Sequence, residues 1–171
     1  MIKQVLPDCT LICIEPNLRG ISYVHKDASY YDKDVTLIDL ESVVEKFDSD
    51  DILVFFDDHQ NFDSRIDFLI KNNFQHILFE DNYPPYIGDC ISPKKVIEKS
   101  QEIDYEKLNK YIQHYEEFPP IYKTELTGWY DDASKYNYVD SLCSDSLRYP
   151  ELWSEREHYY WICYVKIKKM I

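Results

Sequence analysis

The chain has 171 residues, with 19 Lys+Arg against 32 Asp+Glu and a formal net charge of -13. A length of this order is typical of one domain with a core of its own, and a hydrophobic content of 44% excludes a disordered chain. The acidic balance argues against nucleic acid as a partner, because a duplex binder needs a basic face. No apolar run reaches the ~20 residues that a bilayer requires, and the N-terminus lacks a secretory signal, so we expect no membrane partner.

The cysteine and glycine content further limits the class of protein and the kinds of cofactor site that the chain can contain. The cysteines are odd in number and include no C-x-x-C pair, which favours a reduced, cytoplasmic compartment over a disulfide framework. They are Cys9, Cys13, Cys90, Cys143 and Cys163. The three glycines lie far apart, so the sequence contains neither a P-loop nor a G-x-G-x-x-G turn.

The first half of the chain alternates between short β-prone runs and helical spacing. We predict strands over 10–15, 21–25 (weaker), 51–56 and 76–79, and helices over 38–47 and 62–71. A strand, a helix and a strand within about 30 residues form a βαβ unit, which implies a parallel sheet. Because the strand runs are continuous rather than alternating, we expect the sheet to be covered on both faces.

The second half is less periodic. Residues 93–101 and 104–118 have helical spacing, and 158–168 is typical of a terminal strand. The stretch 119–155 is a long aromatic loop region. The overall prediction is a single α/β domain over 1–171, with a Rossmann-like, mostly parallel sheet flanked by helices.

Acidic clusters directly follow two of the predicted strands. Asp57-Asp58-His59 follows the strand at 51–56, and Glu80-Asp81-Asn82 follows the strand at 76–79. Neighbouring parallel strands end at the same edge of a sheet, which is where open α/β sheets bind ligands. Carboxylates that converge there repel one another unless some are protonated or a cation lies among them.

Oxygen ligands of this kind select a hard divalent cation such as Mg²⁺, Mn²⁺ or Ca²⁺, which can act as a Lewis acid toward a substrate. We predict His59 as a base near neutral pH. The alternative is that Asp58 or Asn61 merely caps the helix at 62–71 and that His59 is a turn residue.

Two further acids follow earlier predicted strands. Glu15 ends the first strand, where an acid can accept hydrogen bonds from ribose hydroxyls. Asp27 follows the predicted strand at 21–25 and would line the same cleft.

The segments Leu53-Val-Phe-Phe-Asp-Asp-His-Gln60 and Ile77-Leu-Phe-Glu-Asp-Asn82 resemble strands four and five of class I S-adenosylmethionine-dependent methyltransferases. The metal-dependent branches of the cephalosporin-hydroxylase and macrocin O-methyltransferase type are the most similar. The resemblance implies Asp57, Glu80 and Asp81 as ligands of a divalent metal, with Mg²⁺ expected. Asp58 is the alternative to Asp57 as the first ligand. If the looser resemblance to catechol-type O-methyltransferases applies instead, Asn82 is an alternative ligand. Glu15 and Asp27 are similar to the family's cofactor-binding acids.

The chain also departs from that family. Only nine residues precede Thr10 and none is glycine, so the usual first strand and the glycine-rich loop are lacking. The resemblance therefore implies an N-terminally truncated relative.

Three functions stay open on the sequence alone. The first is metal-dependent O-methylation of a sugar or other small hydroxyl compound, with S-adenosylmethionine as cofactor and His59 as base. The second is a non-catalytic binding or assembly module, in which a partner or a second copy covers an exposed sheet edge. The third is a metal-dependent glycosyltransferase that uses a nucleotide sugar.

Overall fold

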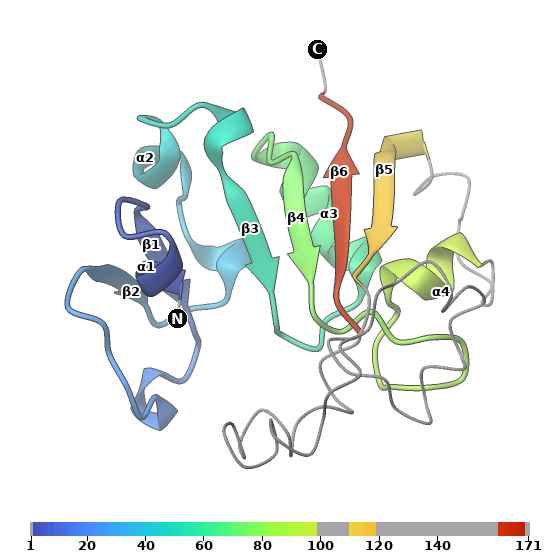
Figure 1. Ribbon diagram of the computed structural model, residues 1–171, viewed down its shortest axis with the longest axis horizontal. Helices are drawn as coiled ribbons and strands as arrows, with labels where there is room; N and C mark the ends of the chain where they lie inside the picture. The colour runs from blue at the N-terminus through green and yellow to red at the C-terminus, as the bar shows by residue number, and fades with distance from the viewer. Residues whose placement is uncertain (1, 99–109, 119–160, 170–171) are drawn as a thin grey trace, which may run out of the picture. The chain divides into compact units, whose positions relative to one another are not determined.

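The computed structural model describes residues 2–98, 110–118 and 161–169 (Figure 1). The chain divides into two compact units, Met1–Lys46 and Phe47–Ile171, and each has its own sheet. Among the described residues, no helix is long and apolar enough to cross a membrane. The predicted loop region at 119–155 lies outside the described residues.

The first unit contains a two-stranded parallel sheet. Strand β1 (Leu11–Ile14) pairs with β2 (Ala28–Tyr31), and Ile14 lies opposite Tyr31. β1 confirms the strand predicted over 10–15. The short helical segments of this unit are α1 (Ile2–Val5), η1 (Leu18–Gly20), η2 (Val35–Leu37) and α2 (Glu41–Val44).

The strand predicted over 21–25 is wrong, because this segment is irregular and the strand begins at Ala28. The backbone of His25 accepts a hydrogen bond from the Ala28 N–H at 3.2 Å, and its ring nitrogen accepts from the Asp27 N–H at 3.2 Å. These bonds form a turn that leads into β2. Tyr23 and Val24 are exposed, so no burial stabilises an extended conformation there.

The second unit contains a four-stranded mixed sheet in the order β3-β4-β6-β5. β3 runs parallel to β4, while β6 runs antiparallel to both β4 and β5. The elements are η3 (Ser49–Asp51), β3 (Leu53–Phe56), α3 (Phe62–Lys71), β4 (His76–Phe79), α4 (Pro93–Ile97), β5 (Ile112–Glu117) and β6 (Cys163–Ile167). The predicted βαβ unit is therefore present as β3-α3-β4, and the protein has mixed α/β content.

Helix α3 covers one face of this sheet, behind β4 and β6 in the view of Figure 1. Phe62 packs edge-on against Phe79, and Phe68 packs edge-on against Phe56, with ring centroids 5.2 and 6.5 Å apart. Ile66 is completely buried on the same side of the helix. After Lys71, Asn73 adopts a φ of 54°, a conformation that asparagine tolerates and that ends helices. The core of this unit therefore lies between α3 and the sheet.

The helix predicted over 104–118 is wrong from Ile112 on, because Ile112–Glu117 forms β5; residues 110 and 111 are helical, and 104–109 lie outside the described residues. Tyr111, Ile112 and Tyr115 do have helical spacing, but the segment pairs with β6 from Ile112 opposite Ile167 to Glu117 opposite Cys163. This long-range pairing overrides the local pattern.

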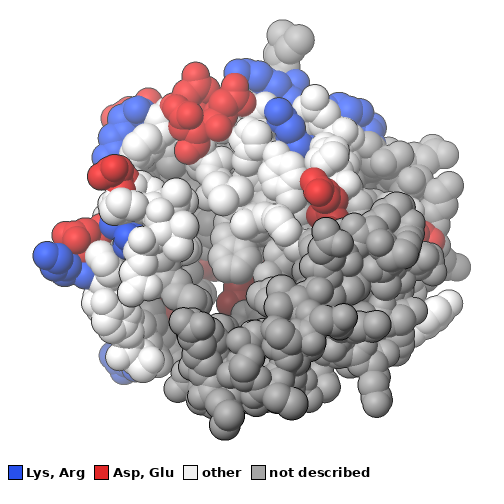
Figure 2. All heavy atoms as spheres, viewed as in Figure 1, with Lys and Arg blue, Asp and Glu red and all other residues white. Residues whose placement is uncertain are grey.

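Within the part of the chain that the structure describes, the other face of the four-stranded sheet is only partly covered at β3. Leu53 and Phe55 of β3 are 57% and 48% exposed, whereas Phe56, which points to the α3 side, is buried. Figure 2 shows uncharged atoms over the middle of this face and charged side chains along its upper border. Among the described residues, none covers Leu53 and Phe55 of β3 fully, contrary to the expectation of a sheet covered on both faces.

Candidate metal site

The carboxyl ends of β3 and β4 meet at one edge of the sheet. Phe56 pairs with Phe79 in the parallel register, so Asp57 and Glu80 directly follow paired residues. The Glu80 N–H donates to the Phe56 carbonyl at 3.0 Å and extends the ladder by one residue. The two acidic clusters therefore leave the sheet at the same level, as parallel pairing requires.

His59 is held against Asp81 across this edge. Its backbone N–H donates to Oδ2 of Asp81 at 2.9 Å, and its Nδ1 lies 3.6 Å from Oδ1 of the same carboxylate. The φ of His59 is 50°, a left-handed conformation that costs a non-glycine residue about 1 kcal/mol. The bond to the Asp81 carboxylate compensates for this strain and fixes the position of the imidazole.

Asp57, His59 and Asp81 form the group that can hold a cation. Each offers one ligand atom, and these atoms all lie within 4.8 Å of one another. Asp81 is buried, whereas Asp57 and His59 are exposed and accessible from solvent. Two carboxylates and an imidazole suit Mn²⁺ better than Mg²⁺, which prefers oxygen ligands alone.

Glu80 lies beside this group, and its carboxyl group has a raised pKa. Partial burial, the negative charge of Asp57 and a side-chain hydrogen bond with Asp57 raise the pKa of Glu80 from 4.5 to about 7. At neutral pH the Glu80 carboxyl is therefore partly protonated. Glu80, which the sequence predicts as a ligand, is not one of the three residues whose ligand atoms lie within 4.8 Å of one another, so it lies beside the cation group rather than in it.

Two of the alternative ligands already have structural partners. Oδ2 of Asp58 accepts from Nε of Arg65 at 2.8 Å and lies 2.6 Å from a second guanidinium nitrogen of that residue. Asn82 is buried, and both ends of its amide are hydrogen-bonded within the protein, to Tyr115 and Lys94. The geometry therefore favours Asp57 over Asp58 and leaves Asn82 outside the cation group.

The alternative in which the Asn61 side chain merely caps the helix at 62–71 is wrong. Asn61 is the residue before α3, but its side chain makes no capping hydrogen bond. Its Oδ1 instead accepts from the Ile91 N–H at 2.7 Å, which ties the loop after β4 to the start of the helix.

Asp89 belongs to this site, although the sequence analysis did not single it out. Its Oδ1 lies 3.2 Å from Nδ1 of His59. This hydrogen bond raises the pKa of His59, with the charges of Asp81, Asp89 and Asp57 adding to the effect, and it lowers the pKa of Asp89. The signal is weak in sequence, because Asp89 is 30 residues from His59 and follows no strand.

Tyr83 supports the same loop. Partial burial and a hydrogen bond to Asp81 raise the pKa of the Tyr83 phenol, which therefore stays protonated at any ordinary pH. Gly88 has a φ of 72° and packs so closely on the Tyr83 ring that a Cβ atom could not be accommodated. The loop that carries Asp89 is therefore anchored beneath the site.

Glu15 and Asp27 belong to the first unit, where the structure does not bring them together. Glu15 follows β1, and its Oε1 accepts from the Asn17 N–H at 2.7 Å. Asp27 precedes β2, so it lies at the opposite end of the parallel pair from Glu15. The acid that follows β2 is Asp32, which lines an open hollow of about 370 Å³ with Pro16, Asn17, Leu18 and Arg19.

No protein-family model matches the chain, and no curated protein and no solved structure matches it either.

Proposed function

We propose that this chain binds a divalent cation at the carboxyl ends of β3 and β4 and uses it to act on a small hydroxyl compound. The observation that carries the proposal is the convergence of Asp57, His59 and Asp81, whose ligand atoms lie within 4.8 Å of one another. The residues come from two strand ends 22 positions or more apart in sequence, with Asp81 buried and His59 in a strained conformation. Such strain is typical of functional sites.

The reaction that we propose is methyl transfer from S-adenosylmethionine, within a Rossmann-like fold related to class I methyltransferases. The support is the resemblance of the two strand ends together with the parallel β3-α3-β4 unit. Many doubly wound folds combine parallel strands with a reversed one, as β6 does here. The methyl carbon would leave the sulfonium sulfur for a hydroxyl oxygen, and the hydroxyl proton would pass to a base.

The role of His59 divides this proposal into two testable forms. As a cation ligand through Nδ1, His59 could not accept a proton at that atom, and a water molecule would take the substrate proton. As a base, His59 would leave the cation to Asp57, Asp81 and Glu80. Because an ionised carboxylate only accepts, Nδ1 donates its proton to Asp89 at 3.2 Å, so the first form requires that a cation displace this hydrogen bond.

Calorimetric titration of the chain with Mn²⁺, and then with S-adenosylhomocysteine, tests both parts. We expect Mn²⁺ binding that His59→Ala weakens at least tenfold if His59 is a ligand. Retained Mn²⁺ affinity in His59→Ala would assign the histidine as the base. Absence of heat with millimolar S-adenosylhomocysteine would refute methyl transfer and leave only the cation site.

The non-catalytic alternative rests on a different observation. The full sequence has three glycines, none close to another, so no glycine-rich loop is available for the cofactor. Cation binding without any S-adenosylhomocysteine or nucleotide-sugar binding would favour a binding module.

A further inference from the structure

A closed ring of hydrogen bonds lies next to the candidate metal site. Asn82 follows Asp81 and is 2% exposed. Its Nδ2 donates to the Tyr115 hydroxyl at 2.9 Å, and its Oδ1 accepts from the Lys94 backbone N–H at 2.8 Å. Because the Lys94 N–H can only donate, it fixes which end of the amide faces which partner.

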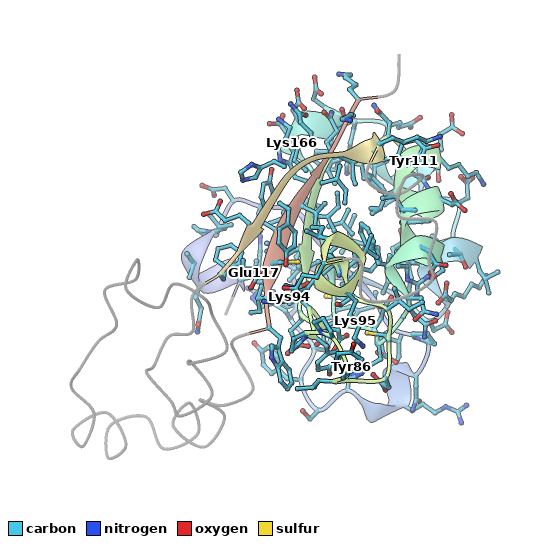
Figure 3. The ribbon with its side chains drawn as sticks, turned by 90° about the vertical axis from the view of Figure 1, so that its right-hand side faces the viewer. Tyr86, Lys94, Lys95, Tyr111, Glu117 and Lys166 are labelled. Atoms are coloured by element: carbon cyan, nitrogen blue, oxygen red, sulfur yellow. The ribbon has the colours of Figure 1, made fainter. Side chains whose placement is uncertain are left out.

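The ring closes through β5 and α4. The Tyr115 hydroxyl donates to Oε1 of Glu117 at 2.8 Å, and Oε2 of Glu117 binds Nζ of Lys94 at 2.8 Å. Figure 3 shows Lys94 of α4 and Glu117 at the end of β5 side by side. Lys94 thus takes part twice, with its backbone at Asn82 and with its ammonium group at Glu117.

The ring immobilises the residue after Asp81. The Asn82 backbone N–H also donates to the Trp161 carbonyl at 2.8 Å, so both its main chain and its side chain are held. With Asn82 fixed on one side and β4 on the other, the backbone of Asp81 has little freedom. Its carboxylate is then presented to the His59 N–H at 2.9 Å.

We propose that Tyr115, Asn82 and Glu117 are positioning residues, which hold the end of β4 so that the Asp81 carboxylate faces the cation. This inference rests on the proposed cation site. Outer-shell groups of this kind typically change metal affinity by about 10–100-fold when they are removed. A part-buried ring of this kind resists rearrangement, because moving Asn82 would break its two side-chain hydrogen bonds in a largely desolvated position.

The variant Tyr115→Phe removes the hydroxyl that links Asn82 to Glu117. The matched control is Tyr164→Phe on β6, which removes a hydroxyl bonded to Nδ1 of His76 at 2.7 Å on the other face of the sheet. Both variants lose one oxygen; Tyr115→Phe loses two side-chain hydrogen bonds and Tyr164→Phe loses one. Only the first contacts the residue next to Asp81.

The experiment is calorimetric titration of both variants and the parent chain with Mn²⁺, together with the His59 amide proton resonance of the metal-free chain. We expect Tyr115→Phe to weaken Mn²⁺ binding about tenfold and to shift the His59 amide resonance, and Tyr164→Phe to do neither. Equal Mn²⁺ affinity for Tyr115→Phe and the parent, or equal weakening in both variants, overturns the inference alone. A parent chain that binds no Mn²⁺ refutes the cation site and the inference together.

Discussion

The neighbouring acids Asp57 and Asp58 should respond in opposite ways to the same substitution. Asp58 pairs with Arg65, whose side chain is 6% exposed, whereas the Asp58 side chain is 30% exposed. Removing one member of a buried ion pair costs ~3–5 kcal/mol, because the remaining charge loses the interaction that offset its desolvation. The partial exposure of Asp58 reduces this, so we expect Asp58→Asn to lower the free energy of unfolding by ~2–3 kcal/mol. Mn²⁺ affinity should be retained.

Asp57→Asn should give the converse result. Asp57 is exposed, and its charge raises the pKa of Glu80, so its removal relieves a repulsion and leaves stability unchanged or higher. Mn²⁺ affinity should fall at least tenfold. Urea denaturation gives the stability of each variant, and calorimetry gives its affinity. If Asp58→Asn abolishes Mn²⁺ binding without loss of stability, the roles are exchanged and the reasoning is refuted.

Three further predictions concern the same end of the sheet. The raised pKa of Glu80 means that its contribution to stability is present below pH 4.5 and is lost as the pH rises to about 7. After allowance for solvent screening we expect this contribution to the free energy of unfolding to be ~1–2 kcal/mol. Urea denaturation measures it as the pH-dependent difference in unfolding free energy between the parent and Glu80→Gln. A difference that does not vary with pH would contradict the prediction. Gly88→Ala should destabilise the chain by ~2 kcal/mol or more in the same assay, because its φ of 72° is strained for alanine and the Cβ would overlap the Tyr83 ring; an unchanged midpoint would show that the loop adapts. Tyr86 is 96% exposed at a φ of 70°, so Tyr86→Gly should raise the thermal midpoint by relieving about 1 kcal/mol of strain, and a lowered midpoint would reveal a contact that this reasoning lacks.

The sequence predicts the local elements of the second unit well. The helix at 62–71 and the strand at 76–79 have the boundaries of α3 and β4, because apolar residues at i, i+4, i+7 and i+8 and a compact β-prone run determine them locally. The described part of the terminal strand also agrees, with β6 at Cys163–Ile167 inside the predicted 158–168. In these cases short-range patterns and final packing coincide.

The errors arise where long-range pairing decides the structure. β5 was predicted as helix because its apolar residues have helical spacing, but its partner β6 lies about 50 residues further along the chain. The β-prone run at 21–25 places Asp27 after a strand, whereas the parallel partner of β1 begins at Ala28, so Asp27 precedes it. No local pattern reveals such a partner.

The candidate site was predictable only in outline. That Asp57 and Glu80 leave the sheet together follows from the βαβ unit and is a property of topology. Which of the two acids is available to bind a cation does not follow from topology, because the ion pair between Asp58 and Arg65 depends on how α3 turns toward β3. The approach of Asp89 to His59 depends on the path of an irregular loop, for which the sequence carries little signal.

The most direct test of the cation site is the two-dimensional amide NMR spectrum of the chain during titration with substoichiometric Mn²⁺. Paramagnetic broadening should first remove the resonances of residues 57–59 and 80–82, which surround the three ligand atoms. The acidic residues Asp48, Asp50 and Asp51 serve as an internal control, because they cap or belong to η3, before β3, and lie outside this group. Broadening that affects the control residues equally, or none at all, would contradict the account.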